Sequence, residues 1–110
     1  MEHANKIIDS ALSYFKAGYN CAESVLLAIA KDALKIDSDL VPRIAPGFGG
    51  GISRCGYVCG AVSGAVMGFG LKYGRNSPEE LRAKTYNRVV EFCKQFQEKF
   101  GSIVCRVVWM

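Results

Sequence analysis

Five cysteines are the residues of this chain best suited to chemistry: Cys21, Cys55, Cys59, Cys93 and Cys105. A thiolate is a strong nucleophile and a soft metal ligand, so such side chains suit thiol–disulfide exchange or the binding of a soft metal. None of them forms a Cys-x-x-Cys motif, and the only histidine, His3, lies close to the N-terminus. Neither a thioredoxin-type motif nor a Cys/His zinc finger is therefore expected.

The first residues, Met-Glu-His-Ala-Asn-Lys, carry an acid at once and lead into no apolar region. This pattern predicts that the chain has no signal peptide, and hence a cytoplasmic location. In the reducing cytoplasm, cysteines are more often catalytic, redox-sensing or metal-binding than structural. The compartment therefore favours a functional role for the thiols.

Length and composition predict one globular domain over residues 1–110. Half of the residues are hydrophobic, which is enough for a single core, and 22% are charged. The net charge of +4 comes from lysines and arginines of the C-terminal part, which alternate with glutamates. Interleaved charges are typical of a solvated helix face, and no aromatic platform accompanies them, so we expect no nucleic-acid binding.

The N-terminal part predicts two helices. Apolar residues recur at helical spacing from about Glu2 to Ala17, and Gly18 follows as a helix end. Asn20 followed three residues later by Glu23 indicates a capping box at the start of a second helix. Its apolar positions extend to about Lys35.

Residues 37–51 read as a loop that contains two prolines and the run Phe48-Gly49-Gly50-Gly51. Such a run presents backbone N–H groups to an anion or makes a tight connection with unusual dihedral angles. No Lys-Ser/Thr pair follows it, as a phosphate loop requires, so the tight connection is favoured.

A third helix is predicted over about Ser53–Tyr73, with no charged residue between Arg54 and Lys72. Small residues recur along it every fourth position: Gly56, Gly60, Gly64 and Gly68. A membrane span would show a similar pattern, but the uncharged stretch is short and no second apolar segment accompanies it. We therefore expect a buried central helix whose glycine strip packs against a helix of the same chain or of a second subunit.

The C-terminal part predicts a long helix and a short one. Ser77 followed by Pro78 indicates the start of the long helix, and Gly101 indicates its end. Ser102 is expected to cap a short final helix over Cys105–Met110. The predicted fold is thus all-α, a compact bundle of four main helices plus a short C-terminal helix, with the glycine-rich third helix at its centre.

These elements place several cysteines in the first turns of helices, namely Cys21, Cys55 and Cys105. The positive end of the helix dipole stabilises a thiolate there, which lowers the pKa of such a thiol. Cys59 would lie one turn beyond Cys55, with β-carbons about 5–6 Å apart, a spacing better suited to a shared metal, or to separate partners from other helices, than to a disulfide. Cys93 lies beside the apolar stripe of the long helix, so it points inward, where a cysteine can also simply pack.

Five motifs in order resemble the C_GCAxxG_C_C family of small redox-active proteins. They read Gly-Tyr-Asn-Cys-Ala-Glu-Ser-Val from residue 18, Phe-Gly-Gly-Gly from 48, Cys-Gly-Ala-Val-Ser-Gly-Ala from 59, Phe-Cys from 92 and Gly-Ser-Ile-Val-Cys from 101. The resemblance implies that the family's cysteines are Cys21, Cys59, Cys93 and Cys105, and that Cys55 is an extra thiol. It implies redox activity and names no substrate.

Three functions are compatible with these residues. In the first, a thiolate at Cys21 or Cys59 exchanges disulfides or electrons with a redox partner protein, as a thiol–disulfide oxidoreductase that requires no cofactor. In the second, Cys21, Cys59, Cys93 and Cys105 hold a metal ion or an iron–sulfur cluster. In the third, the cysteines only pack, and the chain is a helical interaction protein that forms a homodimer through its glycine strip.

Overall fold

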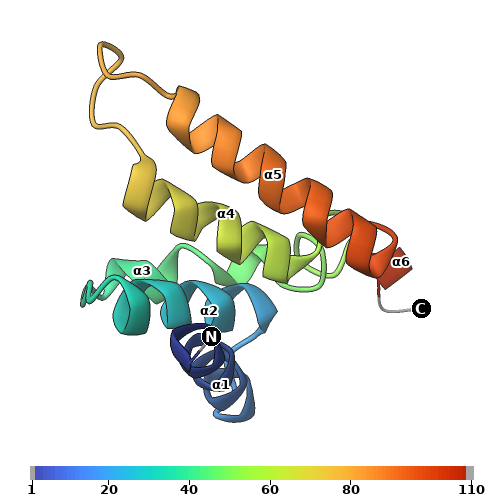
Figure 1. Cartoon of the computed structure of the whole chain (residues 1–110). Helices are drawn as coiled ribbons and strands as arrows, with labels where there is room; N and C mark the ends of the chain where they lie inside the picture. Colours follow the sequence, from blue (N-terminus) through green and yellow to red (C-terminus); the bar gives the residue numbers. More distant parts are fainter. Residues whose placement is uncertain (1, 109–110) are drawn as a thin grey trace.

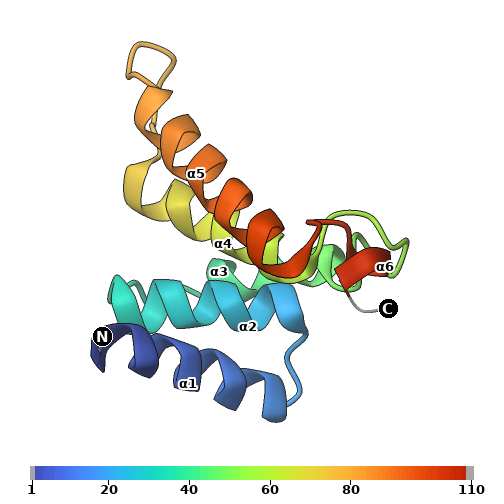
Figure 2. The same ribbon diagram turned by 45° about the vertical axis from the view of Figure 1, so that its right-hand side comes forward.

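The computed structural model describes residues 2–108, and the side chains of residues 6–108. Its elements in chain order are α1 (Glu2–Lys16), α2 (Cys21–Leu27), the π-helix η1 (Ala28–Ala33), α3 (Leu40–Arg43), the 3₁₀-helix η2 (Pro46–Phe48), α4 (Gly60–Tyr73), α5 (Ala83–Phe100) and α6 (Cys105–Val108). The all-α fold class is confirmed. In Figures 1 and 2, α2 with η1 lies between α1 and α4, and α5 packs on the other side of α4.

The two N-terminal helices begin and end close to their predicted positions. Asn20 and Glu23 form the predicted capping box: the N–H of Glu23 donates to Oδ1 of Asn20 at 3.0 Å, and the N–H of Asn20 donates to Oε1 of Glu23 at 2.9 Å. Gly18 ends the first helix region with a φ of +115°. Beyond Leu27 the second helix continues as η1, a π-helix that the sequence pattern did not indicate.

The third main helix begins at Gly60, so its predicted start at Ser53 was wrong. The backbone from Gly50 to Arg54 has positive φ at every residue, including the non-glycine residues Ile52 and Ser53. A left-handed backbone costs about 1–2 kcal/mol for each such residue and is incompatible with an α-helix. Several N–H groups of this turn donate within it, those of Ser53 to the carbonyl of Gly47 at 2.8 Å and of Arg54 to the carbonyl of Gly49 at 3.1 Å. The glycine run is thus the tight connection that the sequence predicted.

The glycine strip of α4 packs within the chain, against α2 and η1. A β-carbon at Gly64 would lie 2.7 Å from the carbonyl oxygen of Ala22, and one at Gly68 would lie 2.8 Å from the side chain of Ile29. This contact leaves no room for a second subunit on the strip. The predicted homodimer through the face of Gly56, Gly60, Gly64 and Gly68 is therefore corrected, and Gly56 itself lies in the loop before α4.

The long helix α5 begins at Ala83, not at Ser77 as predicted. The guanidinium of Arg75 donates to the carbonyls of Pro78 and Glu80, each at 3.1 Å, and holds residues 77–80 in a separate turn. The helix ends as predicted at Gly101, whose φ is +84°. The hydroxyl of Ser102 accepts from the N–H of Val104, just before α6. Residues 109–110 of the predicted final helix lie outside the described part.

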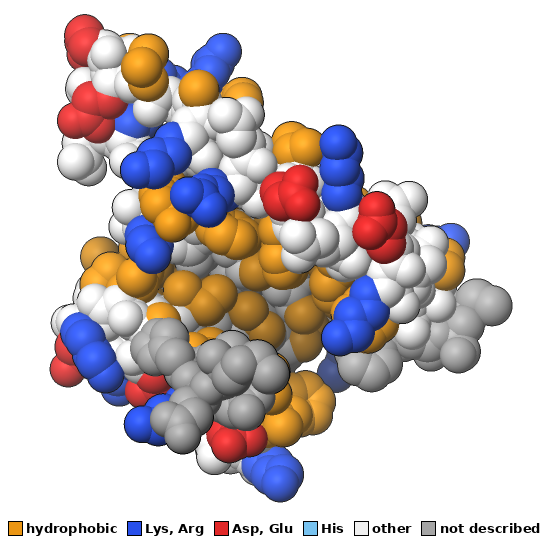
Figure 3. Space-filling model, in the orientation of Figure 1, with side chains coloured by type: hydrophobic (Ala, Val, Ile, Leu, Met, Phe, Trp, Pro, Cys, Tyr) orange, Lys and Arg blue, Asp and Glu red, His pale blue; other side chains and the backbone are white. Residues whose placement is uncertain are grey.

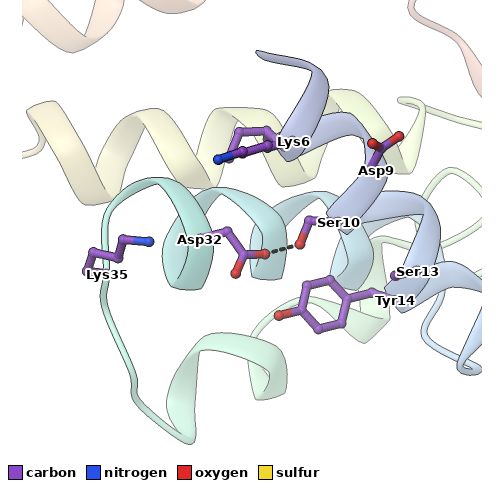
Figure 4. A pocket seen from close by; sticks show the side chains of 8 residues that line it. Lys6, Asp9, Ser10, Ser13, Tyr14, Asp32 and Lys35 are labelled. Carbon is purple, nitrogen blue, oxygen red and sulfur yellow. Dashed lines mark hydrogen bonds between the residues drawn. The ribbon is translucent and has the colours of Figure 1, made fainter. Parts of the chain in front are cut away.

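The core lies under α2 and is made of small and aliphatic residues: Ala22, Leu26, Leu27, Ala30, Val41 and Ala45. Beside it, α1 is tied to η1 by the hydroxyl of Ser10, which donates to the carboxylate of Asp32 (Figure 4). Among the described helices, none is both long enough and apolar enough to cross a bilayer.

Candidate functional site

The segment directly before α4 pairs with the segment directly before α6, although the two are distant in the sequence. Val58 and Val104 form an isolated antiparallel bridge. On either side of it, the N–H of Cys59 donates to the carbonyl of Ile103 at 2.7 Å, and the N–H of Cys105 donates to the carbonyl of Tyr57 at 2.5 Å. The bridge therefore fixes the backbones of two cysteines beside each other.

A third cysteine reaches the same place from α2. Cys21 is the first residue of α2, and its sulfur lies against Gly60, the residue that follows Cys59. A β-carbon at position 60 would collide with this sulfur and would also lie 3.1 Å from the carbonyl oxygen of Phe48. The start of α2 and the start of α4 are thus in direct contact, and the glycine makes room for the thiol.

The other two thiols affect the protonation of Cys105. Desolvation raises the pKa of the Cys105 thiol above its ordinary value of 9.0, and negative charge on Cys59 and then on Cys21 raises it further. This direction is opposite to the one expected from the position of Cys105 at a helix start. The reason is that α6 has only four residues, so its dipole is weak, while two other thiols lie near.

The glycine-rich loop forms another wall of this group. A β-carbon at Gly51 would lie 2.6 Å from the β-carbon of Cys105 and 2.6 Å from the backbone nitrogen of Tyr57. Our sequence analysis noted the glycine run but did not connect it with the thiols. We refer to Cys21, Cys59 and Cys105 as the thiol group: Cys59 is 1% exposed, and the other two are half-buried.

The structure does not bring Cys93 into the thiol group. Cys93 lies on α5 next to Phe92, whose ring centroid is 5.6 Å from that of Phe69 on α4. The part of α4 between Gly60 and Phe69 is about 14 Å long. Cys93 is half-buried beside this part of α4, away from the start of the helix where the thiol group lies.

Cys55 is exposed in the loop before α4, so its predicted place in the first turn of a helix, on one face with Cys59, was wrong. The left-handed turn before it prevents a helix there. Its carbonyl accepts a hydrogen bond from the guanidinium of Arg106 at 3.1 Å.

Metal binding finds no support in the positions of the donor atoms. Among the side chains of residues 6–108, no three from His, Cys, Asp or Glu are arranged to hold a metal ion. The four-cysteine ligand set proposed from the sequence is not assembled, because Cys93 is separated from the other three. The residues present therefore do not fit a four-coordinate metal or an iron–sulfur cluster.

A polar cavity of about 650 Å³ lies elsewhere, between α1 and η1 (Figure 4). Its lining is Lys6, Ile7, Asp9, Ser10, Ser13, Tyr14, Asp32 and Lys35. It contains no cysteine, and one of its two serines, Ser10, is already bound to Asp32. The thiol group is therefore the better candidate site.

Comparison with known proteins gives one match. The model of the family described as "Putative redox-active protein (C_GCAxxG_C_C)" matches residues 19–109, which is most of the chain. No curated protein and no solved structure matches the sequence.

Proposed function

The chain belongs to the C_GCAxxG_C_C family of redox-active proteins, and from this premise we propose that it exchanges thiols and disulfides with a partner protein through its thiol group. One observation carries the proposal: three cysteines from three separate segments meet around the bridge between Val58 and Val104. A group of this kind needs no cofactor for a two-electron exchange.

Cys21 is the attacking thiol in this proposal. It is half-buried and so can be reached from solvent, whereas Cys59 is enclosed. Cys105 is a poor attacking group at neutral pH, because its raised pKa keeps it protonated. These differences divide three similar thiols into an accessible one, an enclosed one and one whose raised pKa disfavours attack.

The reaction has two steps. The Cys21 thiolate attacks one sulfur of the partner's disulfide, the partner's S–S bond breaks, and its second sulfur leaves as a thiolate. Cys59 then passes its proton to the partner thiolate released in the first step and attacks the Cys21 sulfur of the mixed disulfide, and the partner's remaining sulfur leaves as a thiolate. The mixed disulfide breaks, an internal disulfide joins Cys21 and Cys59, and the partner has gained two electrons.

The test is disulfide mapping after exposure of the reduced protein to oxidised glutathione. We expect the wild-type chain to form a Cys21–Cys59 disulfide, which mass spectrometry of alkylated peptides identifies. Cys59→Ser should retain glutathione on Cys21, because the resolving thiol is missing, and Cys21→Ser should form neither species.

Cys93→Ser is the matched control and should behave like the wild-type chain. Circular dichroism of each variant checks that the helices are intact. Five free thiols in the oxidised wild-type protein would contradict the proposal and favour the alternative of a helical interaction protein with structural cysteines.

A further inference from the structure

One face of the molecule carries an apolar groove that does not include the thiol group. Figure 3 shows hydrophobic side chains gathered in a hollow between α5 and the pair of α1 and α2. Part of it is a cavity of about 270 Å³ between η1, α4 and α5. It is lined mainly by Ile29, Ala33, Ala65, Phe69, Tyr73 and Phe92.

A row of aromatic rings extends this groove along α5. The centroids of Phe92 and Phe96 are 6.0 Å apart, and those of Phe96 and Phe100 are 4.6 Å apart. A second hollow on α5 is lined by the same three rings, and Phe92 lines both hollows. No side chain of α5 is fully buried, although the whole helix is described. Its apolar stripe is therefore only partly covered by α4.

The first helix carries a second apolar stripe, which the described part of the chain leaves exposed. Ile8, Leu12 and Phe15 are 57%, 53% and 58% exposed. Their spacing of four and three residues places them on one side of α1. The stripe is about 10 Å long, and the row from Phe92 to Phe100 is about 12 Å long, so the two surfaces match in length.

The exposed area of the chain exceeds that of a typical monomer. A chain of 12.0 kDa exposes 7549 Å² here, whereas a compact monomer of this mass exposes about 6,000 Å². The excess of about 1,500 Å² is larger than the roughly 800 Å² that each partner contributes to a standard interface. Apolar patches of this kind mark interaction sites.

We propose that a second copy of this chain covers the groove, with the α1 stripe of each copy seated in the groove of the other. A two-fold dimer needs a surface that complements itself, and the chain carries both an exposed apolar stripe and an apolar hollow. The pairing is independent of thiol chemistry, because neither surface contains Cys21, Cys59 or Cys105.

The test is the mass of the protein in solution, measured by light scattering and sedimentation with a reductant present, so that disulfides cannot join chains. Leu12→Lys places a charge in the proposed interface, and Val90→Lys is the matched control. Both residues are 53% exposed, but Val90 lies on the outer side of α5, away from Phe92 and Phe96. Because neither is buried within the chain, both variants should retain their helices in circular dichroism.

We expect a wild-type dimer of twice the chain mass, weakened about tenfold or more by Leu12→Lys and unchanged by Val90→Lys. A Phe96→Lys variant should weaken it in the same way from the groove side. A wild-type monomer over about a hundredfold range of concentration would overturn the proposal. A dimer that tolerates both Leu12→Lys and Phe96→Lys would overturn it as well and would place the interface elsewhere.

Discussion

The sulfur of Cys21 fills the space that a β-carbon of Gly60 would occupy. This relationship gives a physical reason for the Cys-Gly-Ala-x-x-Gly motif of residues 59–64. Its first glycine admits the thiol of α2, and its second, Gly64, lets α4 approach the backbone of Ala22. The motif therefore encodes the contact between α2 and α4 as well as one of the thiols.

Gly60→Ala tests this contact. The added methyl group meets the Cys21 sulfur and two backbone atoms, so the start of α4 has to move. We expect a loss of about 1–3 kcal/mol in the free energy of unfolding, as for other overpacked sites, and a changed alkylation rate of Cys21. Urea denaturation and timed alkylation measure the two effects.

Gly70→Ala is the control on the same helix. Nothing lies within 4 Å of a β-carbon at Gly70, so alanine there should stabilise the helix by about 0.5–1 kcal/mol. If Gly60→Ala and Gly70→Ala changed the free energy of unfolding by the same amount, the contact of Gly60 with Cys21 would not contribute to stability.

A second pair of variants tests the contact of Gly51 with Cys105 and Tyr57. Gly51 and Gly101 both have positive φ, at +74° and +84°, so alanine strains the backbone at either position. Only at Gly51 does the new methyl group also meet Cys105 and Tyr57. We expect Gly101→Ala to lower the free energy of unfolding by about 1 kcal/mol and Gly51→Ala to lower it clearly more, as measured by denaturation. Equal losses of stability in the two variants would show that the close contact between Gly51 and Cys105 does not contribute.

The raised pKa of Cys105 predicts slow alkylation. Peptide mapping of timed alkylation should give a pH profile for Cys105 with a midpoint above 9.0. Cys59→Ser removes a neighbouring negative charge and should shift this midpoint downward. A midpoint below that of an ordinary thiol would contradict the burial and charge described here.

The same shift predicts how stability depends on pH. Because the pKa of Cys105 is higher in the folded than in the unfolded chain, the folded state holds this proton more strongly. Its contribution is fully present below the unfolded pKa and is lost as pH rises through the folded pKa. Denaturation of the wild-type chain and of Cys105→Ser between pH 8 and pH 11 should show a steeper loss in the wild type.

Arg106 anchors the loop that contains Cys55. Its Nη2 donates to the carbonyl of Cys55 at 3.1 Å, and its Nε donates to that of Gly56 at 3.3 Å. Arg106→Met keeps the aliphatic stem and removes both donors, so we expect a loss of about 1 kcal/mol and faster amide exchange around Cys55. Lys94→Met on exposed α5 should leave that exchange unchanged.

Local signals in the sequence predicted local structure well. The capping box of Asn20 and Glu23 and the helix end at Gly101 depend on a few neighbouring residues, and both are present in the structure. The start of α5 was predicted wrongly, although Ser77-Pro78 is a strong helix-start pattern. Arg75 overrides it by binding two carbonyls of the turn.

The assembly of the thiol group could not be read from the sequence. A four-residue glycine period fits Gly56 as well as Gly60, and only the left-handed backbone of residues 50–54 shows why the helix cannot begin earlier. The bridge of Val58 with Val104 joins two short segments that carry no pairing signal of their own. The resemblance named the cysteines but could not show that Cys93 lies apart.

The bridge between Val58 and Val104 also sets an order of events during synthesis. Cys21 and Cys59 leave the ribosome before α5 and Cys105 exist, because α4 and α5 lie between the two halves of the bridge. In that interval the backbone of Cys59 lacks its partner carbonyl at Ile103. A nascent chain therefore presents Cys21 and Cys59 to its surroundings before Cys105 and the bridge that fixes the backbone of Cys59 are in place.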